Sequence, residues 1–283
     1  MRISELNFYP LKSGRGIALN EAEIGPEGVL GDRRMMLADP TGQFVNQRDL
    51  QALAQLQVYP QGGAVRFVMD GKGEMTVPQP PPYRRTDVVV WKSIVSAAVA
   101  EKETNARLSE WLGREVQLVF FDDRAKRTAS DDWAGPDTPV TFADGYQVLV
   151  TTTGSLAALN AEMEKHGEGT VGMERFRANI VIDHDEPFAD DGWEAIEIGG
   201  IRFDLVKPCA RCIMITQDQT TGSRDVANPM TAMGRLRMSA DRRVPGPLFG
   251  WNAVPRGTGH IKVGDIATVV AERAETWAIK RRA

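Results

Sequence analysis

The chain has 283 residues, which is enough for one large domain or two smaller ones. Hydrophobic residues make up 42% of it and charged residues 25%, a globular composition that excludes intrinsic disorder. The net charge of -4 provides no general basic field for binding nucleic acid, and no apolar run reaches the ~20 residues of a membrane span.

Strand-like segments dominate, and helices are few and short. In chain order, Asp49 is expected to cap a helix at residues 50–56, and a strand follows at 86–91. A helix that Asn105 caps and Gly113 ends precedes a strand at 115–121 and a polar connection at 122–137. A strand at 146–153, a helix capped by Ser155 and ended by Gly167, and a strand at 177–183 come next. Many short strands with few helices predict a β-rich α+β fold containing a barrel.

The clearest pattern is a β-hairpin over residues 195–206. Apolar residues alternate on both sides of Gly199-Gly200, which predicts the turn. The second strand leads directly into the motif Cys209-Ala210-Arg211-Cys212, so we expect these residues at the end of a strand. The β-branched run at residues 213–216 predicts that the chain stays extended after the motif.

Cys209 and Cys212 are the only cysteines, which excludes a disulfide-stapled secreted fold. A structural zinc site needs four ligands, and a thioredoxin-like pair should open a helix. Two buried structural cysteines are a third interpretation. The fourth is that Cys212 alone ligates a soft redox metal as a thiolate, favoured by the charges of Arg211 and Lys207. One protein ligand cannot hold a metal, so a cofactor would supply the others.

Several motifs resemble, in chain order, those of MOSC-domain proteins. The run KPCARCIMIT at residues 207–216, followed by Asp218 and Thr221-Gly222, resembles the MOSC signature. The run YPLKS at residues 9–13 resembles the opening of the MOSC N-terminal β-barrel domain. Further matches are LGDR at 30–33, SLAALN at 155–160, FRANIVI at 176–182, PLFG at 247–250 and IKVGD at 261–265.

The resemblance implies a domain organisation. A smaller MOSC N-terminal β-barrel-like domain spans residues 1–121, and its first residues also contribute to the cofactor site. A MOSC β-barrel domain spans residues 122–273, and residues 274–283 form a C-terminal tail.

The resemblance also implies a cofactor and its site. Within the family the chain is similar to the mitochondrial amidoxime-reducing component and its bacterial relatives, molybdenum-cofactor enzymes that reduce N-hydroxylated compounds. By this resemblance Cys212 is the molybdenum ligand and the catalytic residue. The residues implied to hold the molybdopterin are Lys12, Ser13, Arg33, Arg177, Ala210 and Arg211, with Asn179, Asp144 and Asn252 near it.

Charge chemistry supports these implied residues. Molybdopterin carries a phosphate, which Lys and Arg bind, and the planar guanidinium of Arg matches phosphate oxygens. Taken singly, each cation would be a solvated surface charge, and only its place inside a matched motif favours a site. Spacing identifies no clear proton donor, and Asp144 is the candidate.

The implied reaction needs an electron source. Two cysteines cannot ligate a plant-type iron–sulfur cluster, and no Gly-rich nucleotide fingerprint is present. We therefore expect a separate ferredoxin- or cytochrome-type donor with a flavoprotein reductase. Because the N-terminus lacks the apolar core of a secretory signal, we expect a cytoplasmic protein that binds neither membrane nor nucleic acid. Two alternatives remain: sulfur carriage on a cysteine persulfide, and a non-enzymatic carrier of the cofactor.

Overall fold

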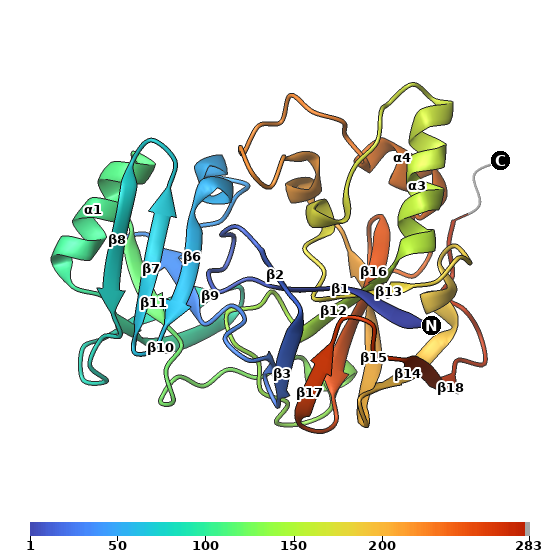
Figure 1. The fold of residues 1–283 in the computed structure, drawn as a ribbon, viewed down its shortest axis with the longest axis horizontal. Coiled ribbons are helices and arrows are strands. Elements are labelled where there is room, and N and C mark those ends of the chain that lie inside the picture. The colour runs from blue at the N-terminus through green and yellow to red at the C-terminus, as the bar shows by residue number, and fades with distance from the viewer. Residues whose placement is uncertain (281–283) are drawn as a thin grey trace.

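Two β-rich lobes organise the chain in the computed structural model, which describes residues 1–280 (Figure 1). The predicted tail at 274–283 lies partly outside the described residues, because these end at Lys280. The N-terminus lies on the lobe drawn at the right of Figure 1. None of the helices in residues 1–280 has the length and hydropathy needed to cross a bilayer.

The larger lobe is built on an eight-stranded mixed sheet with the order β18-β14-β15-β16-β12-β13-β1-β2. Its strands are β1 (Arg2–Phe8), β2 (Ile17–Leu19), β12 (Val148–Thr152), β13 (Ile180–Asp183), β14 (Trp193–Ile198), β15 (Ile201–Ala210), β16 (Leu248–Pro255) and β18 (Ala267–Glu272). A second, three-stranded sheet joins β17 (Gly259–Lys262), β3 (Glu21–Gly25) and β4 (Gly28–Val29). Helices α3 (Thr153–Lys165) and α4 (Met230–Leu236) contact each other beside the large sheet (Figure 1).

The smaller lobe carries two antiparallel sheets and one helix around its own buried core. Its four-stranded sheet is β5 (Met35–Ala38), β11 (Gln117–Phe120), β10 (Ser93–Val99) and β9 (Arg85–Val90), in that order. Its three-stranded sheet is β6 (Gln57–Gln61), β7 (Ala64–Met69) and β8 (Gly73–Pro78), and its helix is α1 (Lys102–Leu112). Strands therefore outweigh helices in both lobes, and the predicted β-rich α+β fold class is confirmed.

The short elements complete the chain. They are α2 (Asp131–Ala134) and the 3₁₀ turns η1 (Gln51–Gln55), η2 (Met173–Phe176), η3 (Ala189–Gly192) and η4 (Ile213–Thr216). Two of these turns, η2 and η4, contact each other on the larger lobe.

The first strand of the chain lies in the larger lobe. Strand β1 pairs antiparallel with β13, and the chain then crosses to the smaller lobe, where the Lys12 amide donates to the Met35 carbonyl at 2.7 Å. Residues 9–14 therefore lie where the lobes meet. The domain boundary at residues 121 and 122 stays a prediction.

The predicted hairpin is confirmed, whereas two segments near it differ from expectation. Strands β14 and β15 pair through Ile198 and Ile201, and β15 runs on through Cys209. The run at 213–216 is not extended but forms the η4 turn, because this buries the Ile215 side chain completely in the core, which outweighs the β preference of isoleucine. The strand predicted at 177–183 starts only at Ile180, because Arg177 has a left-handed backbone.

Gly113 ends helix α1 as predicted, whereas the predicted N-terminal caps are wrong. No side chain caps η1, and the Asp49 carboxylate instead accepts from Asn46 at 3.0 Å. Helix α1 starts before Asn105, whose side chain accepts from the Leu118 amide at 2.9 Å and ties the helix to β11. Helix α3 is capped by Thr152, which accepts from the Ser155 amide. Tertiary partners therefore decide where these polar side chains bind.

A buried acid outside the cavity predicts how stability depends on pH. Asp191 of η3 pairs with Arg237 at 2.7 Å, whereas Asp190 accepts a long hydrogen bond from the Ser155 hydroxyl, at 3.5 Å. Burial, with the charge of Asp191, raises the pKa of Asp190 from 3.8 to about 7. Because the folded protein binds this proton more tightly than the unfolded chain, stability is greatest below the unfolded pKa and falls until pH passes the folded pKa.

We therefore expect Asp190→Asn to remove this fall. The variant should be more stable than the wild type at pH 8 by roughly 2–4 kcal/mol, with little difference at pH 4. Thermal unfolding of both proteins between pH 4 and pH 8 measures this difference in stability. The control is Asp70→Asn, at an exposed aspartate. If the stability of Asp190→Asn and of the wild type changed in parallel with pH, Asp190 would not have a raised pKa.

Candidate functional site

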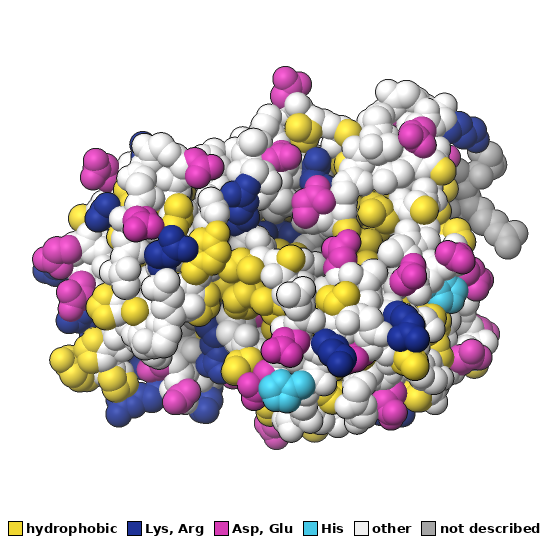
Figure 2. All heavy atoms as spheres, viewed as in Figure 1, with side chains coloured by type: hydrophobic (Ala, Val, Ile, Leu, Met, Phe, Trp, Pro, Cys, Tyr) yellow, Lys and Arg dark blue, Asp and Glu magenta, His cyan; other side chains and the backbone are white. Residues whose placement is uncertain are grey.

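A cavity of about 280 Å³ opens where the two lobes meet. Figure 2 shows the molecule hollowed between its lobes, with Lys and Arg side chains inside the hollow. Every site residue predicted from the sequence lines this cavity: Lys12, Ser13, Arg33, Asp144, Arg177, Asn179, Ala210, Arg211, Cys212 and Asn252. Segments far apart in the sequence thus meet at one place, while the role of each residue stays a prediction.

Strained backbone is concentrated at the cavity. Ser13, Arg33, Trp91 and Arg177 line it with positive φ angles of 64°, 46°, 57° and 55°. Residues with a Cβ disfavour this left-handed region, and such strain persists mainly where function uses it. The strained backbone positions and the charged side chains therefore lie in the same cavity.

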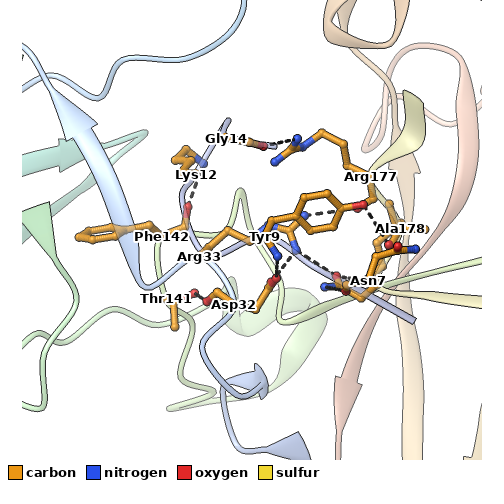
Figure 3. A network of polar contacts seen from close by, with 12 residues as sticks. Asn7, Tyr9, Lys12, Gly14, Asp32, Arg33, Thr141, Phe142, Arg177 and Ala178 are labelled. Atoms are coloured by element: carbon orange, nitrogen blue, oxygen red, sulfur yellow. Dashed lines mark hydrogen bonds and ion pairs between the residues drawn. The ribbon is translucent and has the colours of Figure 1, made fainter. Parts of the chain in front are cut away.

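Two arginines and a tyrosine form the wall nearest the chain crossing (Figure 3). The guanidinium carbons of Arg33 and Arg177 lie 4.1 and 4.3 Å from the centre of the Tyr9 ring. Burial raises the pKa of Tyr9 to about 12 even though both arginines lower it, so its hydroxyl stays neutral and donates to the Ala178 carbonyl at 3.2 Å. A neutral ring thus lies beside two positive charges.

Each of these arginines is fixed by further polar contacts. Arg33 pairs with the buried Asp32 at 2.5 Å and donates to the Asn179 side chain at 3.2 Å. Arg177 donates to the Gly14 carbonyl at 2.7 Å and to Gln219 at 3.2 Å. Burial lowers the pKa of Arg177 to about 10, with the charge of Arg33 adding to the effect, so the guanidinium remains charged at neutral pH.

Lys12 and Asp144 form an ion pair inside the cavity. The ammonium of Lys12 lies 2.5 Å from the Asp144 carboxylate and donates to the Phe142 carbonyl at 2.9 Å. The Asp144 side chain is 74% exposed at the cavity mouth. Desolvation opposes its ionisation, but the charge and hydrogen bond of Lys12, with the charge of Arg33, hold its pKa below the usual range. Asp144 is therefore a carboxylate at neutral pH and orients Lys12.

The cysteine motif enters the cavity at the end of β15. Arg211 donates to the Phe176 carbonyl at 2.7 Å and to the Cys209 sulfur at 3.0 Å, and Cys209 packs against the core. Cys212 is a free, exposed thiol at the start of η4. Lys207, expected to favour the thiolate, instead lies 5.1 Å from the Trp133 ring centre. The Asn252 amide donates to the Lys207 carbonyl at 3.2 Å and braces this end of the strand.

Several cavity residues were not predicted from the sequence. Arg175 donates to the Ile215 and Ala227 carbonyls at 3.0 and 2.8 Å, and it stands directly before the motif at 176–182, which was a usable signal. Phe44, Arg48 and Trp91 reach the cavity from the smaller lobe. No local pattern identifies these three, because packing of one lobe on the other places them there.

The charges that line the cavity favour an anionic ligand. One carboxylate, that of Asp144, faces six cations: Lys12, Arg33, Arg48, Arg175, Arg177 and Arg211. Within residues 1–280, four of these cations have no ion pair with a carboxylate: Arg48, Arg175, Arg177 and Arg211. The Arg211 Nε is also buried without a hydrogen-bond partner. Such a wall fits phosphate oxygens.

The cavity also provides few protein ligands for a metal ion beyond the Cys212 thiol. Nowhere in the described chain do three His, Cys, Asp or Glu residues gather as a metal-binding group. A metal at Cys212 therefore takes its other ligands from outside the protein. The residues present thus fit a phosphate-bearing cofactor that brings its own metal.

Two family models match the chain. The model described as "MOSC N-terminal beta barrel domain" matches residues 1–115, and the one described as "MOSC domain" matches residues 137–268. The chain belongs to the MOSC-domain proteins. The MOSC domain is a molybdenum-cofactor-binding domain, so the molybdenum cofactor predicted from the sequence is confirmed.

Relatives of this MOSC-domain protein include amidoxime-reducing components and molybdenum cofactor sulfurases. It is 28% identical to mitochondrial amidoxime-reducing component 1 of Danio rerio, over 93% of this chain and 83% of that protein. The human protein of the same name is 26% identical, over 93% of this chain and 81% of that protein. Molybdenum cofactor sulfurase of Danio rerio is 28% identical over 83% of this chain, which spans only 30% of the sulfurase.

Proposed function

We propose that this MOSC-domain protein is a molybdenum-cofactor-dependent reductase of N-hydroxylated compounds: hydroxylamines, amidoximes and N-hydroxylated bases. The observation that carries the proposal is an exposed thiol, Cys212, in a cavity with six cations and one carboxylate. The similarity to amidoxime-reducing components over 93% of the chain supports the reaction class. The cytoplasmic location expected from the sequence remains part of this proposal.

Each cavity residue has a role suited to its chemistry. When bound, the cofactor supplies a metal that accepts oxygen and transfers two electrons. Cys212 would hold that metal as a thiolate, because soft sulfur suits molybdenum. The residues that would hold the pterin and its phosphate are Lys12, Ser13, Arg33, Arg177, Asn179, Ala210, Arg211 and Asn252.

The overall reaction converts R–NH–OH, two electrons and two protons into R–NH₂ and water. The lowered pKa of Asp144 leaves it no proton to give at neutral pH, which counts against the donor role suggested by the sequence. Asp144 instead holds the ammonium of Lys12 in the cavity.

A separate electron donor is part of the proposal, because two cysteines cannot ligate a plant-type cluster. We expect the cofactor-loaded protein to reduce benzamidoxime with dithionite-reduced methyl viologen, but not with NADH or NADPH alone. Adding a flavoprotein reductase and a ferredoxin- or cytochrome-type protein should restore turnover with the nucleotide. Turnover with the nucleotide and this chain alone would contradict the separate donor. A loaded protein that reduces nothing with any donor would be a cofactor carrier.

Sulfur carriage is the second candidate, favoured by the similarity to molybdenum cofactor sulfurase. The exposed Cys212 would then hold a persulfide received from a desulfurase. Mass spectrometry after incubation with a cysteine desulfurase and cysteine tests this alternative. A stable added sulfur on Cys212, with no reductase activity, would favour sulfur carriage over reduction.

A further inference from the structure

A strained tryptophan of the smaller lobe reaches the cavity. Val90 and Ser93 pair across the tight turn between β9 and β10, so Trp91 and Lys92 are its two central residues. Hairpin turns of this length favour Asn or Gly with positive φ, whereas Trp91 adopts a φ of 57°. Its side chain is also 46% exposed, so burial does not repay the strain. An exposed, strained tryptophan in a cavity points to a ligand contact.

The indole is held in place from within its own lobe. The Phe44 ring lies 5.0 Å from it, tilted by 54°, and the Phe44 amide donates to the Val89 carbonyl of β9 at 3.2 Å. The Arg48 guanidinium lies 5.1 Å from the ring centre and is oriented by Asn46, which accepts from its Nε at 3.0 Å. These contacts come from the smaller lobe itself, so they preorganise the ring for a ligand.

The position of Trp91 connects the rim of the cavity to its charged interior. Trp91 lines the same cavity as Asp144, the carboxylate that pairs with Lys12. Cys212 lines the same cavity. A molecule that reacts beside Cys212 therefore shares this small space with an exposed aromatic surface.

We infer that Trp91 is a stacking platform that makes the site prefer flat, conjugated N-hydroxylated substrates over flexible aliphatic ones. The inference rests on the proposed function and adds a specificity-determining residue to it. A conjugated amidoxime gains an aromatic contact on the indole, whereas a small aliphatic amidoxime does not. The pterin of the cofactor is also flat, so the test must separate pterin binding from substrate binding.

The test compares benzamidoxime with acetamidoxime, using reduced methyl viologen as the electron donor. In Trp91→Leu the KM for benzamidoxime should rise about 3- to 10-fold with little change in kcat, while the KM for acetamidoxime stays within about 2-fold. Trp91→Phe should restore most of the preference. Tyr83→Leu, which removes another exposed aromatic side chain outside the cavity lining, is the control and should change neither KM.

Two further measurements distinguish substrate binding by Trp91 from a role in folding or in pterin binding. Trp91→Gly should unfold at the same or a higher temperature than the wild type, because glycine relieves the turn, and it should still lose the aryl preference. Pterin content should be unchanged in every Trp91 variant. A loss of pterin, or equal losses for both amidoximes, would overturn the platform and leave the reductase proposal standing.

Binding without turnover separates this inference from the proposed function. Benzamidoxime should quench the fluorescence that Trp91 contributes, obtained as the difference between wild type and Trp91→Leu, and acetamidoxime should not. A wild type that reduces neither compound would refute the reductase proposal, while quenching by benzamidoxime alone would still support the platform. Absence of quenching would overturn it.

Discussion

Cys212→Ser is expected to lower the reduction of N-hydroxylated compounds by about 100-fold or more, because a hydroxyl is a poor replacement for a soft thiolate ligand. The effect should appear in kcat, since Cys212 acts on the metal and not on the cations that bind the phosphate. Steady-state kinetics with reduced methyl viologen, normalised to molybdenum content, measure it.

Cys209→Ser is the matched control for this experiment. It makes the same atomic change three residues away, at a half-buried sulfur that accepts from Arg211 and packs against the core. Activity should stay within about 3-fold of the wild type, because a serine oxygen can also accept that hydrogen bond. Full activity in Cys212→Ser, or an equal loss in both variants, would contradict the assignment of Cys212 as the ligand.

Arg177→Met is expected to lower the pterin content about 10- to 100-fold, the value of one charge-assisted hydrogen-bonding group. This guanidinium is buried, lies near the charge of Arg33 and has no carboxylate partner among residues 1–280. Removing it relieves repulsion and costs the hydrogen bonds to Gly14 and Gln219. We therefore expect the melting temperature of the cofactor-free protein to change by only a few degrees.

Fluorescence of the oxidised pterin and thermal unfolding of the same samples test this prediction. Arg66→Met, which removes an arginine paired with Glu74 on the smaller lobe, is the control and should leave pterin content unchanged. Wild-type pterin content in Arg177→Met would show that Arg177 does not bind the cofactor. A large fall in melting temperature would make its role structural.

The sequence predicted the larger-lobe part of the site better than the part from the smaller lobe. Cys212, Arg177 and Asn179 stand inside recognisable motifs, and all three line the cavity. Arg48 and Trp91 stand in no such motif, and they reach the cavity because the hairpin and the loop beside it pack at the lobe contact. Residues that reach a site only through the packing of two lobes cannot be predicted from local sequence patterns.

Local rules failed where tertiary contacts offered a better partner. The hairpin of β14 and β15 was predictable because its turn and its alternation agree. The η4 turn was not, since complete burial of Ile215 outweighs the β preference of the run. Asn105 likewise leaves the capping position expected for it and binds the Leu118 amide across to β11.

The measurement that tests the central claim most directly is the molybdenum and pterin content of the protein purified from a host that makes the cofactor. Elemental mass spectrometry and pterin fluorescence on one sample should give molybdenum and pterin in equal amounts, one of each per chain. Zinc in place of molybdenum, or protein with neither metal nor pterin, would contradict a molybdenum-cofactor site at Cys212.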